Sequence, residues 1–232
     1  FAISTEETRY YLNGIYMRPK SDGDQGPAMR AVATDGHRLA RVEVPMPSGA
    51  ESMPGVIVPR KAVAEVRKLL DSAGDDNIAI AIALSESKIR IAVDGVVLTS
   101  KLIDGTFPDY ERVIPANNDK ELDIECASFS EAVDRVSTIS SEKSRAVKMS
   151  VQDGQITLSA SSPDYGMASE ELEVDYSGET IEIGFNARYL LDIAQQIEGD
   201  QARFLMSDGA SPTVILDLSD QAALYVLMPM RV

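Results

Sequence analysis

Short runs in which apolar and polar residues alternate dominate this chain, and tight turns separate them. The run 147–151, for example, alternates up to the Asp153-Gly154 pair. Alternation of this kind is typical of strands that bury one face. Further Asp-Gly pairs stand at 35–36, 94–95 and 208–209, and a pair so placed predicts a hairpin turn with positive φ at both residues. We therefore expect mainly antiparallel sheet.

Three segments have helical periodicity instead. The first predicted helix opens after Pro59 and stops near residues 71–74. The second has a capping box formed by Ser128 and Glu131. The third is capped by Asn186 and ends before Gly199, because glycine favours a helix end. The apolar positions at helical spacing are Val63, Val66 and Leu70 in the first helix, Phe129, Ala132, Val133 and Val136 in the second, and Leu190, Ile193, Ala194 and Ile197 in the third.

Each predicted helix follows one strand and precedes three more, so the chain repeats a β-α-β-β-β pattern of about 60 residues. Residues 9–46 resemble the last three strands of a further repeat that lacks its opening strand and helix, and the first residue is Phe1 rather than Met. Both features suggest a fragment. Two repeats make a domain, and the linker-like stretch 114–120 divides the chain into domains 1–116 and 117–232. The predicted fold class is α+β, with antiparallel sheets covered by helices on one face and an incomplete first domain.

The composition is that of an ordinary soluble globular protein. The chain has 232 residues, of which 44% are hydrophobic and 25% charged, which argues against long disorder and against a collagen-like or disulfide-rich scaffold. Cys126 is the only cysteine, so no intrachain disulfide can form, and we expect it to be a small buried hydrophobe. No run approaches the ~18 apolar residues of a membrane span, and no signal segment opens the chain. We expect a cytoplasmic protein with no membrane contact.

Groups that could carry chemistry are scarce. His37 is the only histidine and lies beside a predicted turn, where a pocket-wall residue is a better interpretation than a catalytic base. One His and one Cys cannot supply a zinc site, and no phosphate-binding loop or dinucleotide fingerprint follows a strand. We predict no catalytic residue, no metal site and no cofactor. The acidic clusters, which we interpret as solvated surface, are Asp22/Asp24, Asp75/Asp76 and Glu170-Glu171-Glu173.

The charge is distributed unevenly. With 22 Lys and Arg against 37 Asp and Glu, the formal net charge is −15, which on average disfavours nucleic acid as a partner. The first predicted helix departs from this average. Its basic residues outnumber its single Glu by four to one and give a local charge of 4 − 1 = +3; they are Arg60, Lys61, Arg67 and Lys68, against Glu65. This helix is either a modest phosphate-facing surface or a plain solvated face.

The chain ends on an apolar segment, 224–232. Its first residues, 224–227, have the pattern of a final core strand, but Pro229 cannot continue a hydrogen-bonded ladder. The Met228-Pro229-Met230 stretch is therefore either the end of a core strand or the wall of an adaptable peptide groove, since methionine packs against many shapes.

Four motifs, taken in order, resemble a single family. They are Ala33-Thr34-Asp35-Gly36-His37-Arg38-Leu39-Ala40, Val58-Pro59-Arg60-Lys61, Phe107-Pro108-Asp109-Tyr110 and the ending Tyr225-Val226-Leu227-Met228-Pro229-Met230-Arg231. Together they resemble the bacterial DNA polymerase III beta subunit, the sliding clamp family, over essentially the whole chain. The similarity begins inside the middle domain of that family, after its opening strand and helix, and continues to the family's last residue.

The resemblance implies a DNA-binding role in DNA replication without chemistry of its own. It implies a processivity factor, the non-catalytic subunit of a DNA-directed DNA polymerase holoenzyme. Such a clamp is a ring in which a head-to-tail homodimer of three-domain subunits encircles duplex DNA. Helices line the hole, where phosphate attraction without base readout permits sliding independently of sequence. The implied protein partners are the replicative polymerase catalytic subunit, the clamp loader and repair proteins, which dock through short peptide motifs.

The same resemblance implies roles for three sets of residues. The hydrophobic peptide-binding cleft, between the middle and last domains, matches Leu12, Thr34, Gly36, His37, Arg38, Leu39, Pro108, Arg112, Val113, Asn186, Tyr189, Val226, Met228, Pro229, Met230 and Arg231. The DNA-facing residues are Tyr10, Tyr11, Arg60, Lys61 and Arg67, and the dimer interface includes Thr138 and Ile139. Ala210 and Pro212 stand where the family often has other residues, which leaves the shape of the cleft open there.

Two other functions stay open on the sequence alone. One is a free-standing peptide-binding scaffold module that forms no ring. The other is an enzyme with an acidic site, whose metal-dependent activity would be lost on mutation of Glu170 or Asp75.

Overall fold

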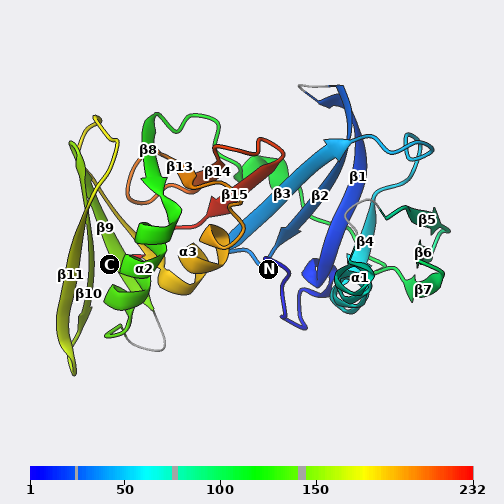
Figure 1. Cartoon of the computed structure of the whole chain (residues 1–232), viewed down its shortest axis with the longest axis horizontal. Helices are drawn as coiled ribbons and strands as arrows, with labels where there is room; N and C mark the ends of the chain where they lie inside the picture. The colour runs from blue at the N-terminus through cyan, green and yellow to red at the C-terminus, as the bar shows by residue number, and fades with distance from the viewer. Residues whose placement is uncertain (24–25, 75–77, 141–144, 232) are drawn as a thin grey trace. The chain divides into compact units, whose positions relative to one another are not determined.

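The chain folds into two compact lobes (Figure 1). The N-terminal lobe is Ala2–Pro108, and the C-terminal lobe is Asp109–Val232 together with Phe1. The predicted domains, 1–116 and 117–232, differ slightly from these lobes and stay a prediction. The computed structural model describes residues 1–23, 26–74, 78–140 and 145–231.

The C-terminal lobe contains the predicted β-α-β-β-β repeat twice. Its elements are η2, a 3-10 helix (Tyr110–Val113), β8 (Lys120–Glu125), α2 (Cys126–Ser137), β9 (Ala146–Gln152), β10 (Gln155–Ser162), β11 (Gly166–Glu173), β12 (Ile181–Asn186), α3 (Ala187–Ala194), β13 (Gln201–Met206), β14 (Thr213–Asp217) and β15 (Ala223–Leu227). The strands pair antiparallel in the orders β11-β10-β9-β12 and β15-β14-β13-β8. The strand that opens each repeat thus pairs with the strands of the other repeat.

Helices α2 and α3 contact each other and pack against strands of both sets. Phe129 of α2 and Phe204 of β13 meet edge to face, with ring centroids 5.5 Å apart, and Ala132 and Val133 of α2 are fully buried. Burial of such apolar side chains is the main favourable term in folding. The prediction of an α+β fold built from antiparallel sheets and helices is confirmed.

The N-terminal lobe contains three strands and then one complete repeat. Its elements are η1, a 3-10 helix (Tyr10–Leu12), β1 (Gly14–Gly23), β2 (Gly26–Thr34), β3 (Arg38–Pro45), β4 (Val56–Pro59), α1 (Arg60–Ala73), β5 (Ile80–Leu84), β6 (Lys88–Val93) and β7 (Val96–Lys101). The strands pair antiparallel as β4-β1-β2-β3 and β5-β6-β7. Helix α1 packs against strands of both sets, over a buried cluster formed by Val56, Val58, Ala62, Ile89, Ile91 and Val93.

Helix α1 begins and ends where the sequence predicts. Pro59 precedes it with extended backbone angles of φ −61° and ψ 145°, and Gly74 follows it in the left-handed region with φ 68°. Proline cannot donate the backbone hydrogen bond that a helix interior requires, and glycine tolerates the left-handed angle. These two residues therefore fix both ends of the basic helix.

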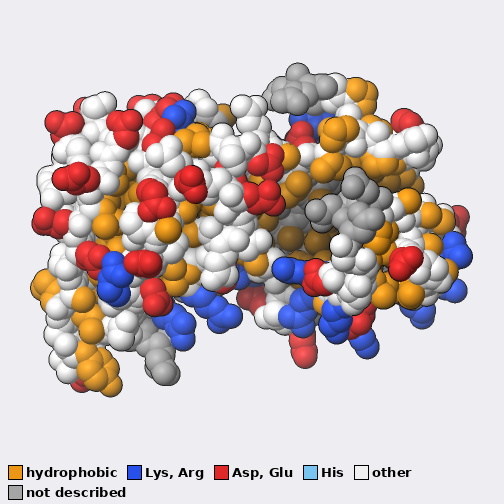
Figure 2. All heavy atoms as spheres, viewed as in Figure 1, with side chains coloured by type: hydrophobic (Ala, Val, Ile, Leu, Met, Phe, Trp, Pro, Cys, Tyr) orange, Lys and Arg blue, Asp and Glu red, His pale blue; other side chains and the backbone are white. Residues whose placement is uncertain are grey.

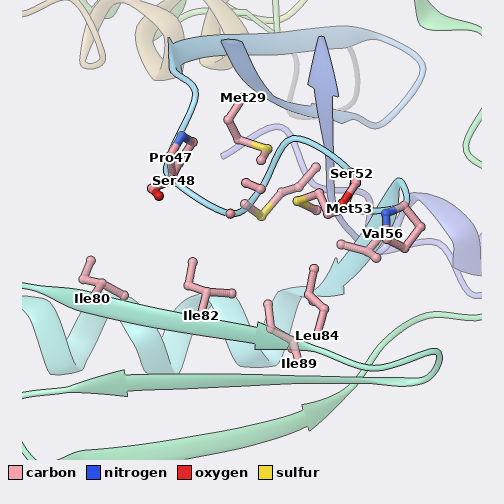
Figure 3. Close-up of a pocket in the computed structure, with 14 residues that line it drawn as sticks. Met29, Pro47, Ser48, Ser52, Met53, Val56, Ile80, Ile82, Leu84 and Ile89 are labelled. Atoms are coloured by element: carbon pink, nitrogen blue, oxygen red, sulfur yellow. The ribbon is translucent and has the colours of Figure 1, made fainter. Parts of the chain in front are cut away.

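An open apolar pocket of about 550 Å³ lies beside β5 in the N-terminal lobe (Figure 3). Ile80 and Ile82 of β5 point toward Met29 of β2 and Met53 of the loop before β4. Strand β5 is an edge strand, whereas its counterpart in the other lobe, β13, pairs on the corresponding side with β8. We assign no ligand to this pocket.

Two predicted helix limits in the C-terminal lobe are wrong. Helix α2 begins at Cys126, because the carboxylate of Glu125 accepts hydrogen bonds from the backbone N–H groups of Ala127 (2.9 Å) and Ser128 (2.7 Å). Glu125 is thus the cap, and the predicted capping box of Ser128 with Glu131 does not form the helix start. Helix α3 is capped by Asn186 as predicted but ends at Ala194.

The residues after α3 explain the second error. The N–H of Gln196 donates to the carbonyl of Ile193, and the N–H of Ile197 donates to that of Ala194. These hydrogen bonds span three residues, so the chain continues in tight turns that keep nearly the same apolar spacing. Periodicity alone therefore places Ile197 in the helix.

The Asp-Gly turns also differ from the prediction. Among the described residues only the Asp94-Gly95 pair has positive φ at both positions, 45° and 77°. At Asp208 the carboxylate instead accepts hydrogen bonds from the backbone N–H groups of Ala210 and Ser211, both at 2.8 Å. Aspartate here closes the loop with its side chain, which is its other common use in turns.

Candidate functional site

The β2–β3 turn carries several residues of the predicted cleft. The hydroxyl of Thr34 donates to the carbonyl of Arg38 (2.8 Å) and accepts from the N–H of Gly36 (3.1 Å). Asp35 accepts hydrogen bonds from the N–H groups of His37 (2.9 Å) and Arg38 (3.0 Å), and its second oxygen lies 3.2 Å from Nε of Arg38. These contacts hold the backbone of the turn, and the side chains of His37 and Arg38 project from it.

Two apolar residues of the predicted cleft lie deep in the N-terminal lobe. Leu12 of η1 is 3% exposed and Leu39 of β3 is 2% exposed. Pro108 is exposed at the end of this lobe, and the preceding Phe107 stacks on Tyr16 of β1 with ring centroids 4.9 Å apart. The buried side chain of Leu39 thus anchors β3, directly after the turn, and that of Leu12 anchors η1. Phe107, next to Pro108, is held by its stacking on Tyr16.

The end of the chain carries a second group of these residues, in the C-terminal lobe. Val226 of β15 is buried, whereas Met228 is 39% exposed. The N–H of Met230 donates to the carbonyl of Gly184 in β12 at 2.7 Å. The segment after β15 therefore lies along the end of β12, close to Asn186. The sequence left open whether this stretch is core or groove wall, and the structure gives a buried strand followed by a partly exposed, anchored tail.

Helix α3 begins beside this tail. The side chain of Asn186 accepts a hydrogen bond from the N–H of Arg188 (3.0 Å) and so caps the helix, and Tyr189 is half-buried in the first turn. In the same lobe, η2 carries Arg112, which pairs with Asp109 at 2.7 Å, and Val113, which is 48% exposed. The start of α3 and η2 therefore carry both apolar and polar side chains. Binding sites for peptides or small ligands contain such a mixture.

Basic side chains gather over α1 (Figure 2). Arg60, Lys61 and Arg67 are exposed on this helix. The fourth cation, Lys68, lies 2.9 Å from Glu65, so its charge is partly compensated. The basic residues of the first helix are therefore exposed, and whether they face phosphates stays a prediction.

The other predicted DNA-facing residues are Tyr10 and Tyr11 of η1. Their rings meet edge to face with centroids 5.8 Å apart. Tyr10 is 53% exposed. The predicted dimer residues Thr138 and Ile139 follow α2, where the hydroxyl of Thr138 donates to the carbonyl of Asp134, Thr138 is exposed and Ile139 half-buried.

The acidic clusters offer no metal centre in the described part of the chain. No group of three or more His, Cys, Asp or Glu side chains there could hold a metal ion. Glu170 pairs with Arg135 at 2.6 Å, and this hydrogen-bonded arginine lowers the pKa of the Glu170 carboxyl. Of the other cluster residues, Asp24, Asp75 and Asp76, together with the side chain of Asp22, lie outside the described residues.

Cys126 is the first residue of α2 and is partly buried. Burial, together with the nearby carboxylates of Glu125 and Asp217, raises the pKa of its thiol to about 11. A thiol with a raised pKa is a poor nucleophile at neutral pH. The prediction of a small buried hydrophobe is wrong in degree, because Cys126 is only partly buried and the strand stops at Glu125.

Comparison with known proteins covers nearly the whole chain. The central domain of the DNA polymerase III beta subunit matches residues 1–109, and the C-terminal domain of that subunit matches residues 111–231. The chain belongs to the DNA polymerase III beta subunit family. The resemblance inferred from the four sequence motifs is thereby confirmed.

Individual members of this beta subunit family are similar along the full chain. A beta sliding clamp from Caulobacter vibrioides is 56% identical over 232 residues, which are 100% of this chain and 61% of that protein. A DnaN sliding clamp from Bartonella birtlesii bound to griselimycin is 54% identical, with a TM-score of 0.94 over 100% of this chain and 61% of that one. A Pseudomonas aeruginosa DnaN clamp bound to griselimycin is 37% identical, with a TM-score of 0.92 over 100% and 61%. The chain thus spans about 61% of the length of these relatives.

Sequence patterns do not reveal two kinds of residue that support the proposed cleft residues. The Asp-Gly pattern predicts Asp35 as a turn residue, but it does not indicate that its carboxylate makes three contacts with two cleft residues. Gly184, whose carbonyl anchors Met230, carries no sequence signal, because backbone acceptors are present at every residue.

In the described residues no helix has the length and apolar character needed to cross a membrane.

Proposed function

We propose that this chain is part of a sliding clamp subunit, a non-catalytic processivity factor of DNA replication. As a homodimeric ring the subunit encircles duplex DNA without sequence preference, and it tethers the replicative polymerase, the clamp loader and repair proteins. The observation that carries this proposal is the match to two consecutive beta subunit domains over residues 1–109 and 111–231. The proposed location is the cytoplasm.

A primer-extension assay tests this proposal. The full-length protein, loaded by its clamp loader onto a primed single-stranded circle, should lengthen the products that the replicative polymerase makes in a single binding event. Products of unchanged length would contradict the proposed function.

The proposed ligand site for partner peptides is formed by the cleft residues that the resemblance implies. The mixture of apolar side chains, such as Val113 and Met228, with polar ones, such as His37 and Arg38, suits an extended peptide with an apolar anchor. Two relatives are bound to griselimycin, and we propose that this chain binds it at the cleft residues that the resemblance implies. Griselimycin is therefore a practical probe of the site.

Binding to duplex DNA should be weak and strongly dependent on salt. We propose that the exposed cations of α1, Arg60, Lys61 and Arg67, face phosphates, and neutralising three phosphates predicts a slope of about −2.7 in a plot of log affinity against log salt. Changing all three residues to Gln should remove most of the slope. Fluorescence anisotropy of the 232-residue chain with labelled duplexes between low and moderate salt measures it.

A matched variant controls for the loss of charge. Lys88, Arg90 and Lys101 lie on β6 and β7 of the same lobe, and changing them to Gln removes the same three charges from another surface. This control should keep the parent slope. Tight binding that distinguishes one DNA sequence from another would contradict the proposal.

Dimer formation should depend on the end of α2. We propose that Ile139 contacts the partner subunit, and a charged side chain cannot be buried there without a partner. In the full-length protein Ile139→Arg should shift the species from dimer to monomer in sedimentation velocity. Gln195→Arg, at the exposed end of α3, adds the same charge and should leave the dimer intact. A stable dimer of Ile139→Arg would remove this residue from the interface.

A further inference from the structure

Arg9 reaches from the segment before η1 to the β2–β3 turn. Its Nη2 donates a hydrogen bond to the backbone carbonyl of Asp35 at 3.1 Å. Its Nη1 lies over Gly36, so closely that a Cβ atom added at Gly36 would be 2.7 Å away. One guanidinium therefore touches two consecutive residues of the turn that carries Thr34, His37 and Arg38.

Nε of the same guanidinium is also held. Nε of Arg9 donates to the carboxylate of Glu6 at 2.8 Å. The carbonyl of Glu6 in turn accepts a hydrogen bond from the side chain of Asn13 (3.1 Å), and the N–H of Ser4 donates to the carbonyl of Leu12 (3.1 Å). The segment 4–13 thus closes on itself, and Arg9 projects from it with a restricted orientation.

Gly36 makes this close approach possible. Its φ of 90° lies in the left-handed region, which glycine tolerates better than other residues. Because Gly36 lacks a side chain, the planar guanidinium lies directly against the turn. Both oxygens of the Asp35 carboxylate accept from His37 and Arg38, and Arg9 binds the backbone carbonyl of the same residue. The Asp35 carboxylate and the Arg9 guanidinium therefore both hold the turn.

We propose that Arg9 is a positioning residue for peptide binding: through Asp35 and Gly36 it fixes the turn that presents His37 and Arg38. This inference rests on the proposed function, since it concerns the same ligand site. Arginine suits the role because its planar fork can bind two acceptors at once, whereas the lysine ammonium is a flexible point charge. Arg9 is thus required for its shape as well as its charge.

The test compares Arg9→Ala and Arg9→Lys with the parent in calorimetric titrations with griselimycin. A charge-assisted hydrogen bond of this kind supports a loss of roughly five- to tenfold in affinity for Arg9→Ala. Arg9→Lys should recover little of that loss, because one ammonium cannot both pair with Glu6 and reach the Asp35 carbonyl while covering Gly36. Arg90→Ala, an exposed arginine on β6, is the matched control and should bind as the parent does.

Hydrogen exchange separates positioning from general stability. In Arg9→Ala the amides of His37 and Arg38 should exchange faster, while the thermal midpoint stays within about 2 °C of the parent. Faster exchange throughout β1, β2 and β3 would indicate a merely structural role and overturn the proposal. Parent affinity in either Arg9 variant would also overturn it.

Met228→Ala, measured in parallel, tests whether griselimycin binds at the proposed peptide site. If Met228→Ala binds griselimycin like the parent, the proposed ligand site fails. If Met228→Ala weakens binding and Arg9→Ala does not, the ligand site stands and only the role of Arg9 fails. Loss of affinity in both variants, with unchanged binding in Arg90→Ala, supports both proposals.

Discussion

Met228→Ala should weaken the binding of griselimycin to this chain by about three- to eightfold. Met228 follows the last strand and is 39% exposed, so a ligand can cover what remains of its apolar surface. Burying a fully exposed large apolar side chain is worth ~1.5–3 kcal/mol, so covering the exposed part of Met228 is worth about 0.6–1.2 kcal/mol, and a tenfold change in affinity corresponds to about 1.4 kcal/mol. Isothermal titration calorimetry on the parent and the variant measures the difference directly.

Glu171→Ala provides the control for this experiment. Glu171 is an exposed residue of β11 whose carboxylate accepts a hydrogen bond from the Gln155 side chain, and it belongs to none of the proposed ligand residues. Its removal should leave the affinity unchanged. Equal affinities of Met228→Ala and the parent would mean that the apolar chain end is only the end of a core strand.

Asp217→Asn should lower the free energy of unfolding of the C-terminal lobe by about 2–4 kcal/mol. Asp217 ends β14, is 3% exposed and accepts four hydrogen bonds. Its donors are the N–H groups of Glu198 (2.7 Å) and Gly199 (3.2 Å) and both the N–H and the hydroxyl of Ser219 (2.7 Å each). An amide cannot accept at both positions, so buried donors would lose their partner. Urea unfolding followed by circular dichroism gives the change.

Asp208→Asn is the matched control for burial. Asp208 likewise accepts several hydrogen bonds. Its donors are the N–H of Ala210 and both the N–H and the hydroxyl of Ser211, but Asp208 is exposed to water. Asparagine is accepted in such turns, and water can replace a lost partner, so the cost should stay below about 1 kcal/mol. Equal losses in the two variants would contradict the argument from burial.

The pH dependence of Asp217 provides a second check. Burial alone would raise the pKa of this carboxyl, but the hydrogen bonds from Ser219, Glu198 and Gly199 outweigh it and lower the pKa below the usual 3.8. A lowered pKa in the folded state stabilises the protein above the pKa of the unfolded chain, and the gain is lost as the pH falls through the folded value. The difference between the parent and Asp217→Asn should therefore be constant near neutral pH and shrink below about pH 4.

The order of strands and helices follows from local pattern. Helix α1 could be predicted from Pro59 to its end because both limits depend on backbone restrictions of single residues, Pro59 and Gly74. The antiparallel strands follow from alternation, since each side of a strand faces one environment. The repeat then indicates how many strands follow each helix.

Contacts between distant residues could not be predicted in this way. The pairing of β8 with β13, and of β12 with β9, exchanges strands between repeats, and no local pattern encodes an exchange. The start of α2 was missed because a long Glu125 side chain folds back to cap it, a conformation that spacing does not indicate. The ligand residues came from resemblance alone, and the support of Arg9 for the turn depends on a contact 26 residues along the chain.

The hydrogen bond from the N–H of Met230 to the carbonyl of Gly184 affects the rate at which the chain end binds a ligand and the range of ligands that it can bind. A free chain end would lose about 1–2 kcal/mol of backbone entropy for each residue ordered on binding. Here the backbone is already held to β12, so only the side-chain rotamers of Met228 and Met230 remain to be selected. Methionine has flexible rotamers and a polarisable sulfur. A fixed backbone with adjustable side chains allows one site to admit apolar anchors of different shape without a slow rearrangement of the chain.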